Sequence, residues 1–533
     1  MRREMPEPAS PKGIFAVADL PEPPPFSLRN AIAVIGPATI LASLSIGSGE
    51  WLLGPAATVK YGFGILWIAT VSLLLQLFLN MECVRYTLAT GEPLFMGFMR
   101  LRPAGYWAWF WAVTTFLQIG WAGWAATGAG ALAALYLGAL PGPRDSGLVA
   151  WIGVGTFLGA VALVSVGRAV EHAIEGFHRI MAVAIIAYLA LLAFFLIPAT
   201  RWSALVSGFL GLHERGFGPF LSSPDFFLLS AFAAYAGAGG TINATLSYWV
   251  RDKGFGMGGW TGYQVAPVGD KEIAISRPGV TFPTGEESMR KWNGWWKFVA
   301  CDQYLFWLAG AFITVAFPVL VSSVAFPPGA EIRSPAIAGE LAQGLSAVNS
   351  WFWGLTLVTS AWILVTTQIG IIDGFSQIIT DLLWSGSQAV RALGSVKVIY
   401  RGVLGLITVA GLLALAAPLF GLGLEPIILI QLSANWAGVN LLMLAIQTMR
   451  VNRKLLPMAL RPPLWREIIV GLCALFFLAL TSAWLFLSPE AKTFAPYVVA
   501  FFLIAALVAV GLGNLAERQR RLAKESDQSL AGA

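Results

Sequence analysis

Apolar residues run along this chain in long blocks separated by short polar stretches. A helix needs about 20 residues to cross the hydrocarbon core of a bilayer. Twelve blocks are long enough, at about 31–59, 65–89, 106–138, 147–166, 173–198, 226–250, 295–321, 349–384, 399–421, 424–447, 467–488 and 493–514. The pattern predicts an all-α polytopic membrane protein with about 12 transmembrane helices.

Composition supports this class. Charged residues make up 12% of the chain and hydrophobic residues 57%, whereas a soluble domain carries roughly 25% charged residues. The basic residues lie between the apolar blocks instead of forming one basic domain, so we expect the lipid bilayer as a partner and no nucleic acid. The three cysteines have no spacing typical of a disulfide framework or a zinc site, and we expect no cofactor.

The distribution of Lys and Arg predicts the orientation. If the N-terminus is cytoplasmic, 28 of the 34 Lys and Arg residues fall on the cytoplasmic side. This bias satisfies the positive-inside rule with both termini cytoplasmic, as an even number of spans requires. We therefore expect a multi-pass protein of the cell membrane.

The first and sixth blocks are interrupted at mid-length. The first contains Gly47-Ser48-Gly49-Glu50 and the sixth contains Gly237, Gly239 and Gly240. A Gly-Phe-Gly triplet follows each interruption at nearly the same distance, at 62–64 and 254–256. Because the two blocks lie five spans apart, the copies run in opposite directions, as in inverted repeats whose broken helices carry a mid-membrane site. The alternative is a chance repetition of small residues that serve close helix packing.

Glu50 indicates what such a site binds. A carboxylate at mid-depth costs at least about 3 kcal/mol if it is left unpaired, and no Lys or Arg lies at that depth in any block. Peptide oxygens freed by a helix break can replace the hydration shell of a cation. A mobile cation or a proton is therefore the expected partner, and a protonated Glu50 with a purely structural role is the alternative.

Several motifs resemble the Nramp family of divalent-metal transporters, the natural resistance-associated macrophage proteins. They are Gly36-Pro37, GSGEWLLGPAATVKYGFGILW from Gly47, LATGEPL at 88–94, TQIGIIDGF at 367–375 and IQLSANW at 430–436, so that the resemblance covers about residues 30–455. It implies a LeuT-type inverted repeat of five plus five helices, followed here by two C-terminal helices.

The metal motifs of that family are altered in this chain. Gly47-Ser48-Gly49-Glu50 stands where the family has Asp-Pro-Gly-Asn, and Ala238-Gly239-Gly240 where it has Met-Pro-His. Where the third helix of the family has a pair of acidic residues, this chain has only Gln118. Gln431 stands at the position of a glutamine in the family. The fold is expected to be shared, but the substrate is not.

These positions define the predicted site. We expect the substrate at Gly47, Ser48, Gly49, Glu50, Ala236, Gly237, Ala238, Gly239, Gly240, Thr241, Asn243 and Gln431, and metal ligands from Glu50, Gly47, Gly237 and Gln431. All are oxygen donors, and hard cations such as Mg²⁺ take oxygen ligands. The predicted function is transport of a divalent metal cation, more Mg²⁺-like than a transition metal, by alternating access with weak or no proton coupling. The alternative is transport of a small organic solute such as an amino acid or amine.

No nucleophile–base pair or HExxH spacing occurs, so we do not expect an enzyme. Two further acids, Asp302 and Asp373, lie toward the cytoplasmic ends of their blocks; pairing with nearby cations is the ordinary explanation, and a role in ion exit is the alternative. Glu82 and Arg85 are at helical spacing for a local ion pair.

The predicted organisation follows from the repeats. A disordered cytoplasmic tail (1–29) precedes the first five-helix repeat (30–200) and an extracytoplasmic loop (201–225). The second repeat (226–455) includes a cytoplasmic loop (252–295), and two further helices (456–515) lead to a cytoplasmic tail (516–533). The oligomeric state does not follow from the sequence.

Overall fold

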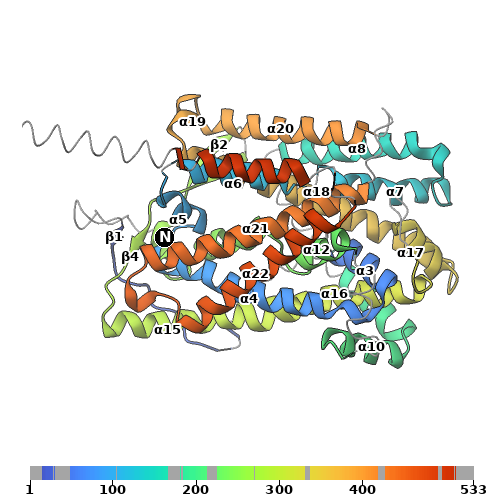
Figure 1. Cartoon of the computed structure of the whole chain (residues 1–533), viewed down its shortest axis with the longest axis horizontal. Coiled ribbons are helices and arrows are strands. Elements are labelled where there is room, and N and C mark those ends of the chain that lie inside the picture. The colour runs from blue at the N-terminus through green and yellow to red at the C-terminus, as the bar shows by residue number, and fades with distance from the viewer. Residues whose placement is uncertain are drawn as a thin grey trace, which may run out of the picture.

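The structure is a computed structural model of the chain. It describes residues 15–27, 29–30, 49–103, 105–119, 121–165, 181, 184–212, 225–268, 271–330, 337–417, 426–489, 492, 495–508 and 510–511, with only the backbone described at 49, 50 and 271. Most helices run along the long axis of the molecule (Figure 1).

Among the described residues, every predicted apolar block contains helix. The first half contains η1 (Gly49–Leu53), α3 (Gly54–Tyr61), α4 (Trp67–Thr90), α5 (Leu94–Arg100), α6 (Tyr106–Leu117), α7 (Gly123–Leu137), α8 (Ser146–Ser165), the helix Ala184–Leu196 and α10 (Ala199–Phe209). The second half contains α12 (Phe226–Tyr235), α13 (Thr241–Asp252), α14 (Gly258–Thr261), α15 (Glu286–Ala300), η4 (Cys301–Leu308), α16 (Ala309–Ala325), α17 (Ile337–Ser346), α18 (Trp351–Gly386), α19 (Gln388–Ala392), α20 (Val396–Ala416) and α21 (Pro426–Leu455). The helices α22 (Leu464–Leu487) and Ala495–Val508 follow.

By length and composition, 7 helices among the described residues can cross a membrane, or up to 8 if one bent pair counts as a span. The remaining predicted blocks correspond to shorter apolar helices or to helices interrupted within the block. In two of these blocks an interruption, and not a lack of apolar residues, shortens the helices: α6 and α7 share one block, and α12 and α13 share another.

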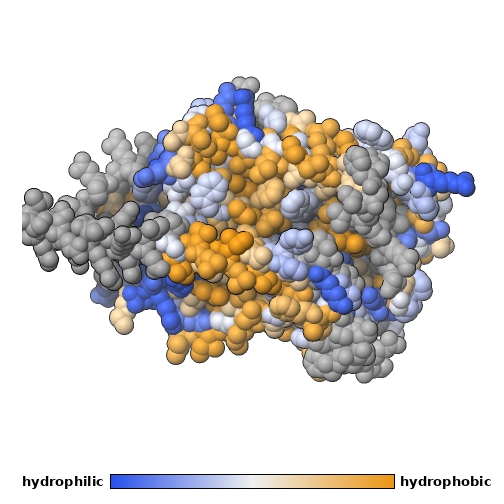
Figure 2. Space-filling model, turned by 45° about the horizontal axis from the view of Figure 1, so that its top comes forward, coloured by the Kyte–Doolittle hydropathy of each residue, from blue (hydrophilic) through white to orange (hydrophobic). Residues whose placement is uncertain are grey.

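The outer surface of the bundle is apolar. Figure 2 shows hydrophobic side chains over the flanks of the helices, with hydrophilic ones mainly toward the two ends. Leu413, Leu475 and Leu507 are each at least 60% exposed on three different helices. A soluble protein rarely exposes such continuous apolar surface, but lipid acyl chains would cover it.

Strands occur at one end of the bundle, at the left in Figure 1. The hairpin β2 (Tyr263–Val268) and β3 (Lys271–Ser276) lies against α18 and α20, and β1 (Ala16–Val17) pairs in parallel with β4 (Val280–Thr281). We call this the strand end. It contains most of the loop that the sequence predicts between residues 252 and 295.

The described part of the N-terminal tail packs against this loop. Leu20 is only 1% exposed, and the indole nitrogens of Trp260 and Trp295 donate to the carbonyls of Asp19 and Pro21, each at 2.8 Å. The prediction of a disordered tail is therefore wrong for residues 15–27. Its Pro-rich composition suggested disorder, but the few apolar side chains find a partner surface that only the folded loop provides.

Charged side chains at the strand end form buried networks. Glu92 accepts hydrogen bonds from the Tyr86 hydroxyl at 2.7 Å, the Gly279 N–H at 2.6 Å and the Arg100 Nε at 2.9 Å. Burial alone would lower the pKa of Arg100, but the hydrogen bond and charge of Glu92 raise that pKa above its ordinary value. Asp381 similarly accepts from the Ser276 N–H and hydroxyl and from the Tyr248 hydroxyl, at 2.6–2.9 Å.

Candidate functional site: two interrupted helices

The sixth apolar block is interrupted where its glycines predict. Helix α12 ends at Tyr235 and α13 begins at Thr241. Between them, Gly239 and Gly240 have φ angles of +79° and +59°, which L-residues with a side chain rarely adopt. Every residue from 236 to 241 is buried, so the break lies inside the bundle.

The first block also departs from regular α-helix. Its described part begins with the π-helical turn η1, which contains the backbone of Gly49 and Glu50, and continues as α3 with Pro55 near its start. The turn η1 packs against α12, so the two interrupted helices are neighbours. Gly47, Ser48 and the carboxylate of Glu50 lie outside the described part of the chain, and their predicted roles remain predictions.

Glycines at the second break allow other helices to approach its backbone. A Cβ atom on Gly237 would lie 2.9 Å from Oε1 of Gln76 on α4 and 3.1 Å from the ring of Trp307 in η4. A Cβ atom on Gly240 would collide with Oε1 of Gln118 and lie 2.9 Å from Cα of Ala437 on α21. The glycines therefore serve both the backbone turn and this close approach.

Gln118 hydrogen-bonds the backbone on both sides of the break. Its Nε2 donates to the carbonyl of Gly239 at 3.0 Å, and its Oε1 accepts from the N–H of Thr241 at 2.9 Å. Asn440 on α21 donates both to the same Oε1, at 2.8 Å, and to the Thr241 hydroxyl, at 3.1 Å. These groups of Gly239 and Thr241, expected to face a substrate, are instead partnered by side chains, because an unpaired peptide group is costly in a membrane.

Gln76 holds the break from the side of α4. Its Oε1 accepts from Nδ2 of Asn243 at 3.1 Å, and that Nδ2 also donates to Oδ1 of Asn80 at 2.8 Å. All three side chains are 0% exposed. We call Gln76, Asn80, Gln118, Asn243 and Asn440 the amide cluster. It contributes neutral oxygen and nitrogen atoms, without a fixed charge, around the second break.

Gln118 reaches the break because its own helix is interrupted. Helix α6 ends at Leu117 and α7 begins at Gly123, and Trp121 and Ala122 between them have positive φ angles of 49° and 66°. Such angles cost about 1–3 kcal/mol for residues other than glycine and occur mostly at functional sites. The Ser433 hydroxyl donates to the carbonyl of Gln118, which satisfies one peptide group released by this interruption.

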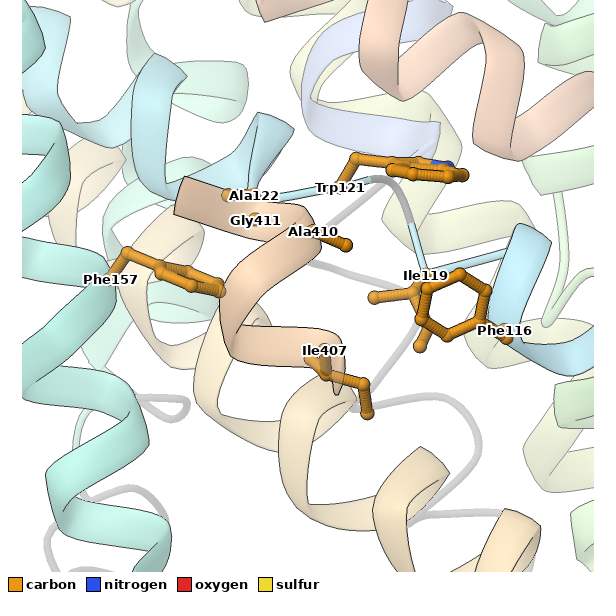
Figure 3. A pocket seen from close by; sticks show the side chains of 8 residues that line it. All are labelled: Phe116, Ile119, Trp121, Ala122, Phe157, Ile407, Ala410 and Gly411. Carbon is orange, nitrogen blue, oxygen red and sulfur yellow. The ribbon is translucent and has the colours of Figure 1, made fainter. Parts of the chain in front are cut away.

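An apolar pocket lies beside this third interruption (Figure 3). It is lined by Phe116, Ile119, Trp121, Ala122, Phe157, Ile407, Ala410 and Gly411. The side chains offer no carboxylate, amide or hydroxyl group, so this pocket is unsuited to an ion.

Gln431 is not joined to the amide cluster by any described contact. Its side chain is half-buried on α21, and its carbonyl accepts from Nδ2 of Asn435 at 2.9 Å. Two residues further on, the Ser433 hydroxyl pairs with the Tyr235 hydroxyl at 2.6 Å, next to the break. The role of Gln431 as a ligand remains a prediction.

Sequence reasoning missed most of the amide cluster. Gln76, Asn80 and Asn440 were not predicted as site residues, and Gln118 was considered only for its place in the third block. A signal did exist, since Ser72, Gln76 and Asn80 recur every four residues within one predicted block. That spacing puts them on one helical face.

Comparison with known proteins agrees with this architecture. No family model and no curated protein matches the chain in sequence. Among solved structures, two mutants of a manganese transporter from Eremococcus coleocola superpose with TM-scores of 0.60 and 0.59 at 13% identity, covering 94% of this chain and 97% of theirs. The likeness establishes the fold. This is an all-α polytopic membrane protein of the LeuT type, as the sequence predicts.

Proposed function

We propose that the protein is a membrane transporter for a hard divalent cation, Mg²⁺ rather than a transition metal, working by alternating access. The observation that carries the proposal is the pair of neighbouring interrupted helices, of which the second is surrounded by oxygen-bearing side chains. The E. coleocola protein with the same fold is a manganese transporter, which supports metal transport as the class of function.

The donor atoms favour a hard ion. Around the second break the polar side chains are amides and hydroxyls, and the sequence of the first interrupted block contains the acid Glu50. Within the described residues, no group of three or more His, Cys, Asp or Glu side chains that could hold a metal is found. Softer transition metals such as zinc and copper prefer sulfur and imidazole ligands, whereas oxygen donors suit Mg²⁺, Ca²⁺ and Mn²⁺. Of these, Mg²⁺ takes few protein oxygens and keeps much of its water.

The N–H groups at the start of α13 disfavour an amino acid as the substrate. A half-helix N-terminus can bind a carboxylate through its free N–H groups. In this protein the N–H of Thr241 already donates to Gln118, and those of Ile242 and Asn243 donate to the carbonyls of Gly239 and Gly240 at 3.3 and 3.1 Å. A carboxylate would have to displace Gln118, whereas a cation would not compete for these donors.

Uptake of Mg²⁺ into proteoliposomes tests the proposal. We expect the wild-type protein to take up Mg²⁺ and Glu50→Gln to lose most of this uptake, because the exchange keeps the shape of the side chain and removes its charge. Glu340→Gln, in α17, is the matched control and is expected to retain uptake. Equal uptake by Glu50→Gln and wild type, or accumulation of an amino acid but not of Mg²⁺, would contradict the proposal.

The orientation is part of the same proposal. With both termini cytoplasmic, the strand end faces the cytoplasm, because the loop 252–295 lies there. Single cysteines introduced at exposed Met458 and Trp351, which lie on opposite sides in the predicted topology, would react with an impermeant thiol reagent from opposite faces of intact cells.

A further inference from the structure

A π-helical segment interrupts the seventh predicted span next to the second break. It is η4, and π-helical turns inside α-helices are frequent at functional sites. Asp302 and Gln303 at its start are 4% and 0% exposed, and Nε2 of Gln303 donates to Oδ2 of Asp302 at 2.9 Å. Oε1 of Gln303 is buried and has no hydrogen-bond partner among the described residues.

The packing of η4 and α13 against α4 brings this pair to the level of two amides in the amide cluster. The Trp307 ring and Gln76 both lie against Gly237, so these residues mark the depth of the break on η4 and α4. Gln303 precedes Trp307 by four residues and Asn80 follows Gln76 by four. Since α4 runs toward the strand end and η4 away from it, Asn80 and Gln303 both lie about one helical turn from the break on the strand side.

Asn243 joins this level through its hydrogen bond to Asn80 at 2.8 Å. Within the described part of the chain, Nδ2 of Asn80 and Oδ1 of Asn243 are, like Oε1 of Gln303, buried without a hydrogen-bond partner. Buried polar atoms in native proteins are nearly always satisfied by protein, water or an ion. Three unsatisfied amide atoms at one level, beside a carboxylate, therefore point to a ligand between α4, α13 and η4.

We propose that this level holds a second, partly hydrated divalent cation, a relay site between the break and the strand end. The inference rests on the proposed function. Asp302 supplies the charge, Gln303 and Asn243 supply oxygen ligands, and Asn80 donates a hydrogen bond to a water of the ion. A site with one carboxylate and neutral oxygens binds weakly enough to release the ion, as conduction through successive sites requires.

Binding stoichiometry separates this site from the main one. In equilibrium dialysis of the detergent-solubilised protein with Mg²⁺, and with Ca²⁺ in parallel, we expect wild type to bind two ions. Asp302→Asn is expected to bind one and to take up Mg²⁺ about tenfold more slowly in proteoliposomes, within the range for loss of one group of a metal site. Gln303→Leu, which keeps the size of the side chain, is expected to show the same loss and replaces Asp302→Asn if that variant does not fold.

Asp373→Asn is the matched control, since it removes another acid from a predicted span, on α18. It is expected to bind two ions and to transport normally. If wild type binds one ion that Glu50→Gln loses, and both Asp302→Asn and Gln303→Leu retain its binding and uptake, the relay site is wrong and the proposed function stands. If wild type neither binds nor transports either ion, the proposed function and the relay site both fail.

Discussion

The second break and the strand end hold their buried polar groups in opposite ways. At the break, neutral amides partner the backbone, as Gln118 does for Gly239 and Thr241. At the strand end, carboxylates are paired with guanidinium groups or with several donors, as Glu92 is with Arg100. Amide hydrogen bonds are individually worth about 0.5–1.5 kcal/mol, whereas breaking a buried ion pair costs about 3–5 kcal/mol.

This difference indicates which parts of the molecule can rearrange during alternating access. A transporter working by alternating access must rearrange around its site while the elements that cover it stay folded. Neutral amides can exchange partners with water or an ion at small cost, and buried charges cannot. We therefore expect substitutions at the strand end to affect stability most, and substitutions at the break to affect transport relative to stability.

The largest expected loss of stability is at Glu82, which makes ion pairs with Arg85 at 2.6 Å and Arg466 at 3.1 Å. Glu82→Ala leaves two buried guanidinium groups without their carboxylate, so we expect a loss of about 3–5 kcal/mol in the free energy of unfolding. Urea unfolding in detergent would measure it. Arg453→Ala, which breaks the Arg453–Glu467 pair where Arg453 is 59% exposed, is the control and should change little. Similar losses in both variants would contradict the contrast between buried and exposed pairs.

Gly240→Ala tests whether transport requires the backbone shape of the second break. The new methyl group would require a left-handed alanine and would meet Gln118 and Ala437. We expect a loss of about 2–4 kcal/mol together with nearly complete loss of Mg²⁺ uptake. Gly402→Ala on α20, where nothing lies within 4 Å of the new atom, should keep uptake and gain up to about 1 kcal/mol. Normal uptake by Gly240→Ala would show that the shape of this break is not required.

Gln118→Leu removes the partner of two backbone groups and of Asn440. We expect a smaller loss of stability, about 2 kcal/mol, but a marked change in transport, because the N–H of Thr241 becomes available to anionic ligands. Proteoliposome assays with Mg²⁺ and with amino acids would measure the change. Gln343→Leu, at an exposed position of α17, is the control. If Gln118→Leu transports Mg²⁺ as wild type does, neutral capping of α13 is not a determinant of selectivity.

The smallest expected effect is at the N-terminal segment. Trp295→Phe keeps an aromatic ring and removes the hydrogen bond to Pro21, which is worth about 1 kcal/mol. Residues 15–27 should exchange amide hydrogens faster while uptake changes little. Trp351→Phe, at a residue 84% exposed, should leave this exchange unchanged. Unchanged exchange in Trp295→Phe would mean that the other contacts of the segment suffice.

Much of the fold was predictable because hydropathy and glycine act locally. The apolar blocks predicted the helices. Gly239 and Gly240 predicted the second break, since few other residues adopt its backbone angles. The ion pair of Glu82 with Arg85 also followed from their spacing and is confirmed at 2.6 Å. The third interruption was not predictable in this way, because Trp121 and Ala122 are not residues that favour left-handed angles.

The candidate site was only partly predictable. Thr241 and Asn243 were expected there from their place after the break, but their partners Gln118, Asn440, Gln76 and Asn80 come from three other helices. Arg466, which completes the ion pairs of Glu82, lies 384 residues away in the chain. No local pattern encodes such contacts.

The sequence by itself determined that this chain forms apolar helices of bilayer length and where glycine interrupts one of them. These outcomes depend on side-chain hydropathy and on backbone angles, which each short stretch carries alone. Only the tertiary structure decided which groups the interrupted backbone meets, because a freed N–H or carbonyl takes whichever partner the packing of distant helices brings within 3 Å. In this protein the partners are neutral amides, and the proposed passage of a cation depends on them.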